Sequence, residues 1–193
     1  MQLDVQVLEN RHVRLEPMTE AHREDLRTAC AADPATWNDL YPFSMLGEAF
    51  DVGWNRMYGK PSPEWAAFAV MTQGRCNGTT SFLAIDPVNA TVEIGATYYG
   101  PALRGGAVNP AAKRLLLAHA FANGARRVQF KVDAINARSR AAVLKLGAIE
   151  EGILRQDRIT WTGRIRSTVV FSVLADEWSA VRERLDARLA VFS

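Results

Sequence analysis

The segment from Ala111 to Phe121 constrains the fold more than any other, because it is predicted to form a helix with almost no polar face. Such a helix must be buried, so we expect it to pack against a sheet with only its first turns reaching solvent. Capping residues mark its ends: Asn109 as N-cap, Pro110 as the first helical residue and Asn123-Gly124 as the stop. Its apolar positions are Ala111, Ala112, Leu115, Leu116, Leu117, Ala118, Ala120 and Phe121.

Strand patterns flank this helix on both sides. Residues 91–99 precede it, and Val128, Phe130 and Val132 alternate with polar residues after it. A strand, a buried helix and a second strand in this order predict a βαβ crossover with parallel strands. The other strands are expected to pair antiparallel, in a meander over 65–71, 79–85 and 91–99 and in a hairpin over 152–161 and 164–174 with Thr162-Gly163 at its tip.

Periodicity and capping residues predict the remaining elements. Alternation at Leu3, Val5, Val7, Val13 and Leu15 indicates strand structure at the start of the chain, and Thr19 is the expected N-cap of a helix over about 20–31. Further helices are expected at 49–58, at 137–146 with Gly147 as its stop, and from Asp176 onward. The order of elements predicts a mixed α/β (α+β) fold in one domain covering residues 1–193.

Composition narrows the class of protein. The chain has 193 residues, 48% of them hydrophobic and 23% charged, which fits one soluble domain with a substantial core. A net charge of +2 without a long basic run argues against nucleic acid as the main partner. No apolar run approaches the ~20 residues that span a bilayer, so we expect neither membrane insertion nor secretion. Cys30 and Cys76 form no CxxC motif, so we expect neither a disulfide nor a metal site, and a reducing, cytoplasmic location.

The loop Arg104-Gly105-Gly106-Ala107-Val108-Asn109-Pro110 opens directly into the buried helix. Small residues let successive amides converge, and the first turn of a helix leaves its amides unpaired with partial positive charge. Such a loop binds phosphate groups, and pyrophosphate in particular. The alternative is an ordinary glycine-rich connection. Lys113 and Arg114 follow in the first turns, where their positive charges either lie near a bound anion or form an exposed stripe on the helix.

Four stretches, in this order, carry a resemblance to a known family. Together with the order of elements, they resemble the GCN5-related N-acetyltransferase (GNAT) superfamily over nearly the whole chain, and its Rim branch (RimJ/RimL-like) of ribosomal-protein N-terminal acetyltransferases most closely. The stretches are Val13-Arg14-Leu15-Glu16-Pro17, Val92-Glu93-Ile94-Gly95, Leu103 to Lys113, and Asn136-Ala137-Arg138-Ser139 leading to Leu146-Gly147.

The resemblance implies a fold and a reaction. The fold is a twisted, mostly antiparallel sheet of about seven strands flanked by helices, which splays between the strand ending near Tyr99 and the strand at Val128–Asp133. The reaction uses acetyl-CoA as donor and an amine as acceptor, with direct transfer in a ternary complex. The resemblance also implies that Asn136 orients the pantetheine arm and that Ser139 meets the sulfur. Taken without the resemblance, these two residues are an ordinary helix cap.

The chemistry of transfer suggests further roles. A protonated amine cannot attack a thioester, so the site needs either a base or a water path that removes one proton. A carboxylate in the cleft is a natural base, and Glu93 is the first choice. Its alternative is an ordinary solvent-facing strand position. A backbone amide near Thr97 or Tyr98 would stabilise the oxyanion, provided that the strand bulges or splays at Gly95. His119 is expected to be a core histidine rather than a base.

The chain departs from the family pattern at two places. Ala107 stands where the superfamily loop has its first glycine, and Asn109 stands where the loop has glycine or alanine. Ala107 would be strained if its φ were positive. Val143 replaces the tyrosine that protonates the leaving thiolate in the family, so another donor must serve, and Ser139 is the candidate.

Several alternatives stay open at this stage. The chain is either an enzyme or a non-catalytic acyl-CoA-binding module, and the donor is either acetyl-CoA or another acyl-CoA such as succinyl-CoA. The acceptor is either a protein N-terminus or a small-molecule amine, bound between residues 33–58 and the late hairpin at 156–166. The aromatic residues of 33–58 either line that cleft or fill the core. The assembly state, monomer or homodimer, is also open.

Overall fold

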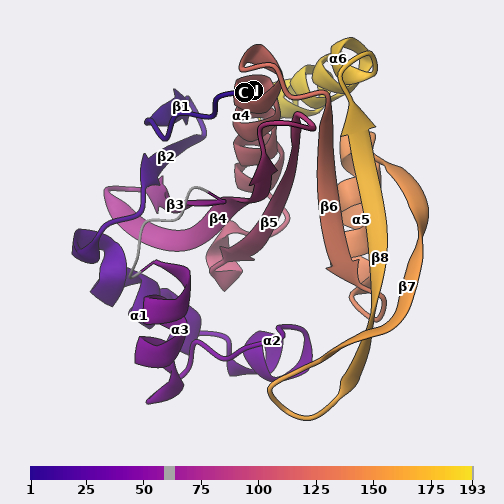
Figure 1. Cartoon of the computed structure of the whole chain (residues 1–193). Coiled ribbons are helices and arrows are strands. Elements are labelled where there is room, and N and C mark those ends of the chain that lie inside the picture. The colour runs from indigo at the N-terminus through magenta and orange to yellow at the C-terminus, as the bar shows by residue number, and fades with distance from the viewer. Residues whose placement is uncertain (59–63, 193) are drawn as a thin grey trace.

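A computed structural model describes residues 1–58 and 64–192 (Figure 1). Its described strands form one sheet of eight in the order β1-β2-β3-β4-β5-β6-β8-β7, and neighbouring strands are antiparallel except for β5 and β6. The strands are β1 Leu8–Asn10, β2 Val13–Pro17, β3 Trp65–Thr72, β4 Arg75–Asp86, β5 Thr91–Tyr99, β6 Arg127–Asp133, β7 Ile149–Ile159 and β8 Ile165–Leu174. The predicted meander, crossover and hairpin are confirmed.

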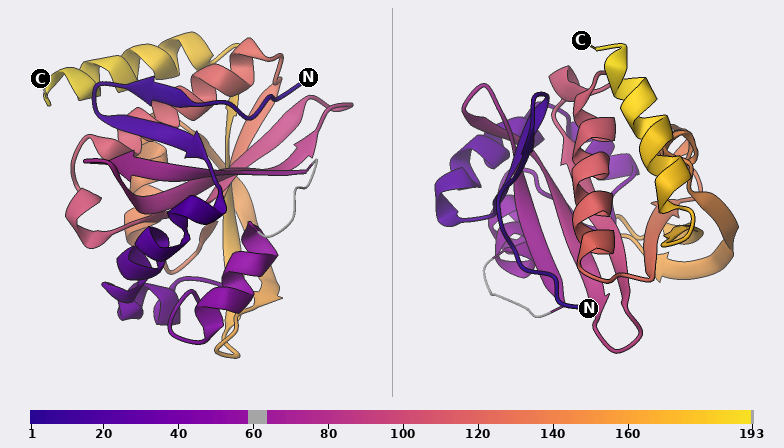
Figure 2. Two further views of the ribbon diagram at one scale, coloured as in Figure 1. Left: turned by 90° about the vertical axis from the view of Figure 1, so that its left-hand side faces the viewer. Right: turned by 90° about the horizontal axis from the view of Figure 1, so that it is seen from above.

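Helices cover both faces of this sheet (Figure 2). The 15-residue α4 lies beside α6 on one face, with α5 next to them, and α1 to α3 lie on the other. Each face has its own hydrophobic core. The helices are α1 Arg23–Ala31, α2 Pro34–Asp39, α3 Ala49–Met57, α4 Val108–Ala122, α5 Ala137–Leu146 and α6 Trp178–Ala190, with 3-10 turns η1 Glu20–His22 and η2 Pro101–Leu103.

The first strand differs from the prediction. Strand structure begins at Leu8, so the alternating residues 3–7 lie outside the sheet and a short β1 brings the total to eight strands instead of seven. The reason is a competing contact: His119 Nε2 donates to the carbonyl oxygen of Asp4 at 2.8 Å, and its Nδ1 lies 3.5 Å from the Gln6 amide. His119 is buried and hydrogen-bonded, which confirms its prediction as a core histidine.

The start of α4 also differs from the prediction. The N-cap is Ala107, with φ −71°, and not Asn109, so Pro110 is the third helical residue instead of the first. The left-handed turn falls two residues earlier, at Gly105 with φ +79°, where glycine has no steric penalty. Ala107 is therefore unstrained.

Helix α2 was not predicted, although its signal is present in the sequence. The Asp33 side chain accepts from the Thr36 amide at 3.3 Å and Pro34 opens the helix. Its Trp37 packs in the core under α1 to α3 together with Phe50 and Trp54, so these aromatic residues fill the core rather than a cleft.

The sheet splays where the crossover strands part. β5 and β6 keep register only from Thr91↔Arg127 to Glu93↔Gln129, and they diverge beyond it (Figure 1). The register between β4 and β5 shifts between Gly95 and Tyr98, and Ala96 has φ +45°. The predicted splay is confirmed, but the bulge lies at Ala96 and not at Gly95.

Candidate active site

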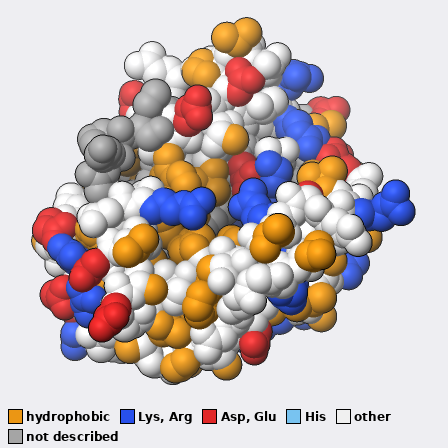
Figure 3. All heavy atoms as spheres, turned by 60° about the horizontal axis from the view of Figure 1, so that its bottom comes forward, with side chains coloured by type: hydrophobic (Ala, Val, Ile, Leu, Met, Phe, Trp, Pro, Cys, Tyr) orange, Lys and Arg blue, Asp and Glu red, His pale blue; other side chains and the backbone are white. Residues whose placement is uncertain are grey.

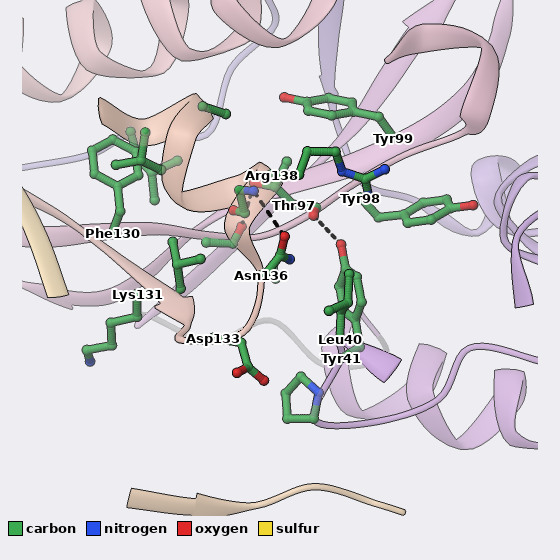
Figure 4. A pocket seen from close by; sticks show the side chains of 18 of the residues that line it. Leu40, Tyr41, Thr97, Tyr98, Tyr99, Phe130, Lys131, Asp133, Asn136 and Arg138 are labelled. Carbon is green, nitrogen blue, oxygen red and sulfur yellow. Dashed lines mark hydrogen bonds between the residues drawn. The ribbon is translucent and has the colours of Figure 1, made fainter. Parts of the chain in front are cut away.

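The divergence of β5 and β6 opens a cavity of about 880 Å³ (Figure 4). Its walls come from β5, β6, the loop before α4, α5, the chain after α2 and the β7–β8 hairpin. The predicted site residues that line it are Glu93, Thr97, Tyr98, Arg104, Gly105, Gly106, Asn109, Asn136 and Ser139. Ala107 and Val108 do not line it, because their side chains pack on the core.

Glu93 is buried, with 9% of its surface exposed, so it is not a solvent-facing strand residue. Its Oε2 lies 3.0 Å from Lys131 Nζ, on the neighbouring strand β6. Both residues line the cavity just where the two strands begin to separate. A carboxylate is therefore held by an ion pair at the apex of the splay, where a ligand can reach it.

The loop before α4 offers a run of amides. Within the described parts of the chain, the amides of Gly105, Gly106, Ala107, Val108 and Asn109 have no hydrogen-bond acceptor. They include the first amides of a long helix, which carry partial positive charge. The loop can therefore bind an anion through its main chain.

Arg104 is already engaged by the protein. Its Nε donates to the Tyr99 carbonyl oxygen at 2.9 Å, its guanidinium contacts the Asp33 carboxylate, and the group lies 5.6 Å from the centre of the Tyr98 ring. The sequence predicted a cation at the loop but gave no sign of its partner. Asp33, from the N-cap of α2, is 71 positions away.

Lys113 was not predicted as a site residue, and it is not part of an exposed stripe. It is buried, lines the cavity, and donates to the hydroxyl groups of Thr97 at 2.7 Å and Thr80 at 3.1 Å. Burial lowers the pKa of Lys113 to about 7. Its spacing to Leu116 and Leu117 could have revealed its burial, because residues three and four apart share a helix face. Arg114, by contrast, pairs with Asp186 on α6 at 2.8 Å.

Residues 12–149 match a family model described as an acetyltransferase (GNAT) domain. The chain belongs to this family. Among solved structures, it is 30% identical to a GCN5-related N-acetyltransferase from Brucella melitensis, with a TM-score of 0.88 and coverage of 96% of this chain and 86% of that one. A T. thermophilus protein assigned provisionally as an acetyltransferase is 37% identical, with a TM-score of 0.88 and coverage of 98% and 100%.

The predicted resemblance to GNAT enzymes, the fold class and the transferase activity toward an amine are thereby confirmed. Mycobacterium smegmatis RimJ, solved with a coenzyme A disulfide, has a TM-score of 0.80 over 96% of this chain and 95% of its own. At 20% identity this likeness shows the shared fold. No curated protein matches the chain.

The bulge of this GNAT enzyme is held from across the cavity. The Tyr41 hydroxyl donates to the Thr97 carbonyl oxygen, and Figure 4 shows the ring reaching toward β5. Burial raises the pKa of Tyr41, so the hydroxyl stays neutral and keeps its proton for this bond. Tyr41 thus lines the cavity as well as contacting the core aromatic residues.

The start of α5 in this GNAT enzyme combines both predicted roles. Asn136 is its N-cap and accepts from the Ser139 amide at 3.0 Å, so the ordinary cap is present. Both residues also line the cavity, and Val143 lines it further along the same helix. The cap uses the main chain of Ser139, which leaves its hydroxyl for other contacts.

Two further findings concern the described residues of the enzyme. Among them, no group of three or more His, Cys, Asp or Glu is arranged to hold a metal ion. No helix in the described ranges is long and apolar enough to cross a membrane.

Proposed function

We propose that the protein transfers the acetyl group of acetyl-CoA to a primary amine, on a protein N-terminus or a small molecule, by direct attack in a ternary complex. The observation that carries this proposal is the run of five unpartnered amides from Gly105 to Asn109, within the described residues, at the edge of the cavity. A diphosphate matches such a run, because it presents several acceptor oxygens and negative charge to a helix N-terminus.

The donor would lie along the loop and then along β5. Gly105, Gly106 and Asn109 line the cavity, whereas Ala107 and Val108 would contribute their amides alone. Arg104 would add positive charge beside the diphosphate from its place next to Tyr98. The RimJ structure with a coenzyme A disulfide supports this donor, since the two chains share a fold.

The pantetheine arm would enter the gap between β5 and β6. Beyond Glu93 the described part of β5 has no register partner in β6, so this edge is open to a ligand. Asn136 would orient the arm at the start of α5. An amide of Thr97 or Tyr98, next to the bulge at Ala96, would stabilise the thioester oxygen as it gains negative charge.

The reaction itself needs two proton transfers. Glu93 would take a proton from the acceptor ammonium, directly or through water, and the free amine would attack the thioester carbon. The carbon–nitrogen bond forms and the carbon–sulfur bond breaks. The attacking nitrogen still carries a surplus proton, which the Ser139 hydroxyl would relay to the leaving thiolate, so that Ser139 regains its own proton and Glu93 passes its proton to solvent. A relay is sufficient because a free thiol has a pKa of ~8.5 and thiolate is a tolerable leaving group.

One substitution tests the amide loop with little change of backbone. Ala107→Pro removes a single N–H, and the φ of −71° at this position suits proline. We expect the dissociation constant for coenzyme A to rise about 10- to 150-fold, because a hydrogen bond to a charged group is worth roughly 1.5–3 kcal/mol. Ala107→Ser keeps the amide and is the matched control. A folded Ala107→Pro variant with wild-type affinity would exclude the loop as the diphosphate site.

A second experiment tests the reaction and the acceptor. Peptides with free N-termini and a set of small primary amines are incubated with acetyl-CoA or succinyl-CoA, and products are identified by mass spectrometry. Acetylated products are expected. Tight binding of coenzyme A without transfer to any amine would favour a non-catalytic acyl-CoA-binding module instead.

A further inference from the structure

Basic side chains gather on the hairpin side of the cavity, away from the loop that precedes α4 in sequence. Arg158 on β7, Arg166 on β8 and Arg138 on α5 line this part, with Asp133 and Asp157 as the acidic residues. Figure 3 shows the hollow on this face, with hydrophobic side chains on its floor and Lys or Arg side chains on both sides of it. Positive charge therefore extends beyond the proposed diphosphate site.

Arg166 is the buried member of this group, with 9% of its side chain exposed. Its Nε donates to the Thr168 hydroxyl at 3.1 Å and lies 3.8 Å from Asp133 Oδ2. Within residues 1–58 and 64–192, its two terminal nitrogens have no hydrogen-bond partner. Because Arg166 lines the cavity, these nitrogens can meet a ligand there. Neither terminal nitrogen is fully buried, so a ligand in the cavity can replace the water that otherwise satisfies them.

The surrounding charges do not neutralise Arg166. Asp133 is nearer to Arg164, whose Nη2 lies 2.5 Å from its Oδ2. Arg158 stands directly opposite Arg166 in the β7–β8 register, and like charges at such positions repel. Asp157 also faces the group, and burial lowers the pKa of Arg166. Arg158, Arg164 and Arg166 together face two carboxylates, those of Asp133 and Asp157, so this group carries an excess positive charge.

We propose that Arg166, assisted by Arg158, binds a carboxylate of the acceptor, so that the preferred substrates are amines with a carboxylate close to the reacting nitrogen. The inference rests on the proposed function. The donor phosphates already have the amides of Gly105 to Asn109, whereas Arg166 comes from the hairpin that forms the expected acceptor wall. The two free terminal nitrogens of one guanidinium match the two oxygens of a carboxylate.

Matched acceptor pairs test this proposal. The first pair consists of two small amines, β-alanine and β-alaninamide. The second pair consists of two peptides that differ only at their second position, which is Asp in one and Asn in the other. The two pairs distinguish a small amino acid from an acidic peptide N-terminus as the source of the carboxylate. We expect wild-type kcat/KM to favour the acid over the amide at least tenfold in one of the pairs.

Variants then assign the preference to its residue. Arg166→Met should bring the acid-to-amide ratio close to one, chiefly through KM, with the dissociation constant for coenzyme A unchanged. Arg158→Met should lower the ratio partially. Arg155→Met, which removes an exposed arginine of the same strand outside this cavity, is the matched control and should keep the wild-type ratio.

The outcomes separate this inference from the proposed function. Equal rates for acid and amide in both pairs would overturn the carboxylate site and leave the acetyltransferase proposal intact. A preference that survives in Arg166→Met and in Arg158→Met would also overturn it. Should Arg166→Met fail to fold, the wild-type ratios and Arg158→Met still decide. Absence of transfer to every amine would remove both proposals together.

Discussion

The carboxylate of Glu93 lies over the α-carbon of Gly95. A Cβ placed on Gly95 would come within 2.9 Å of Glu93 Oε1 and 2.8 Å of Leu83 Cδ1. The two residues share one face of β5, because side chains alternate along a strand. Gly95 thus leaves the room in which the proposed base sits, whereas the bulge that was expected at this glycine is formed by Ala96.

Gly95→Ala is expected to reduce turnover about tenfold or more while the fold survives. The atoms that a methyl group would displace are the ends of two flexible side chains, so we expect a cost in stability of roughly 1 kcal/mol. Turnover with a responsive amine and thermal unfolding would be measured together. In a Glu93→Gln background the same change should have little further effect on turnover, since coupled sites are not additive. Additive losses would show that Gly95 acts on something other than Glu93.

Glu93→Gln is expected to lower kcat by about 10²–10⁴, the range for loss of a general base, with unchanged affinity for coenzyme A. The loss should be largest at low pH, where most of the acceptor amine is protonated and depends on a base. Steady-state rates between pH 6 and 9 measure this. Glu24→Gln, at an exposed position of α1, is the control. A pH–rate profile identical to that of the wild type would remove Glu93 from the mechanism.

Lys113→Met is expected to stabilise the protein more at low pH than at high pH. The folded-state pKa of about 7 lies below the ordinary 10.5, so the buried charge costs free energy at every pH below 7. As the pH rises from 7 to 10.5, the folded chain has lost this proton and the unfolded chain still binds it, so the penalty disappears. Urea unfolding at pH 6 and pH 9.5 measures the gain in the free energy of unfolding of the variant over the wild type. This gain should be larger at pH 6 than at pH 9.5 by a few kcal/mol, at about 1.36 kcal/mol per pKa unit.

The two threonine hydroxyl groups that lose the Lys113 ammonium in this variant can still hydrogen-bond to each other, because Thr80 Oγ1 and Thr97 Oγ1 already lie 2.8 Å apart. A difference in the free energy of unfolding that is the same at both pH values would contradict a depressed lysine pKa.

Ser139→Ala is expected to reduce turnover by about tenfold or less and to leave coenzyme A affinity nearly unchanged. The cap from Asn136 uses the Ser139 amide, so removal of the hydroxyl does not disturb it. Asn136→Ala removes the cap and should cost about 1 kcal/mol of stability. Binding calorimetry and transfer rates on both variants separate the two roles. Full activity of Ser139→Ala would assign Ser139 to structure alone.

Local patterns were sufficient for most of the fold. The apolar helix between two strand patterns predicted β5, α4 and β6, and Gly147 closes α5 with φ +106° as its position indicated. Capping was less reliable, because the left-handed turn at Gly105 shifted the start of α4 by two residues. Periodicity also missed the diversion of residues 3–7 to His119, since alternation shows which side chains share a face and not which strand they meet.

By itself, the sequence determined the order of the elements apart from α2, the family and the place of the amide loop, because these depend on neighbours within a few residues. Tertiary structure alone decided which side chains meet in the cavity. Tyr41 donates a hydrogen bond to Thr97, 56 positions away, and Arg166 comes within 3.8 Å of Asp133 only because β8 pairs with β6. The hydroxyl partners of Lys113 likewise come from β4 and β5, although its place on the apolar helix face is visible in the sequence. Such contacts follow from how elements pack, and packing joins residues that no local pattern connects.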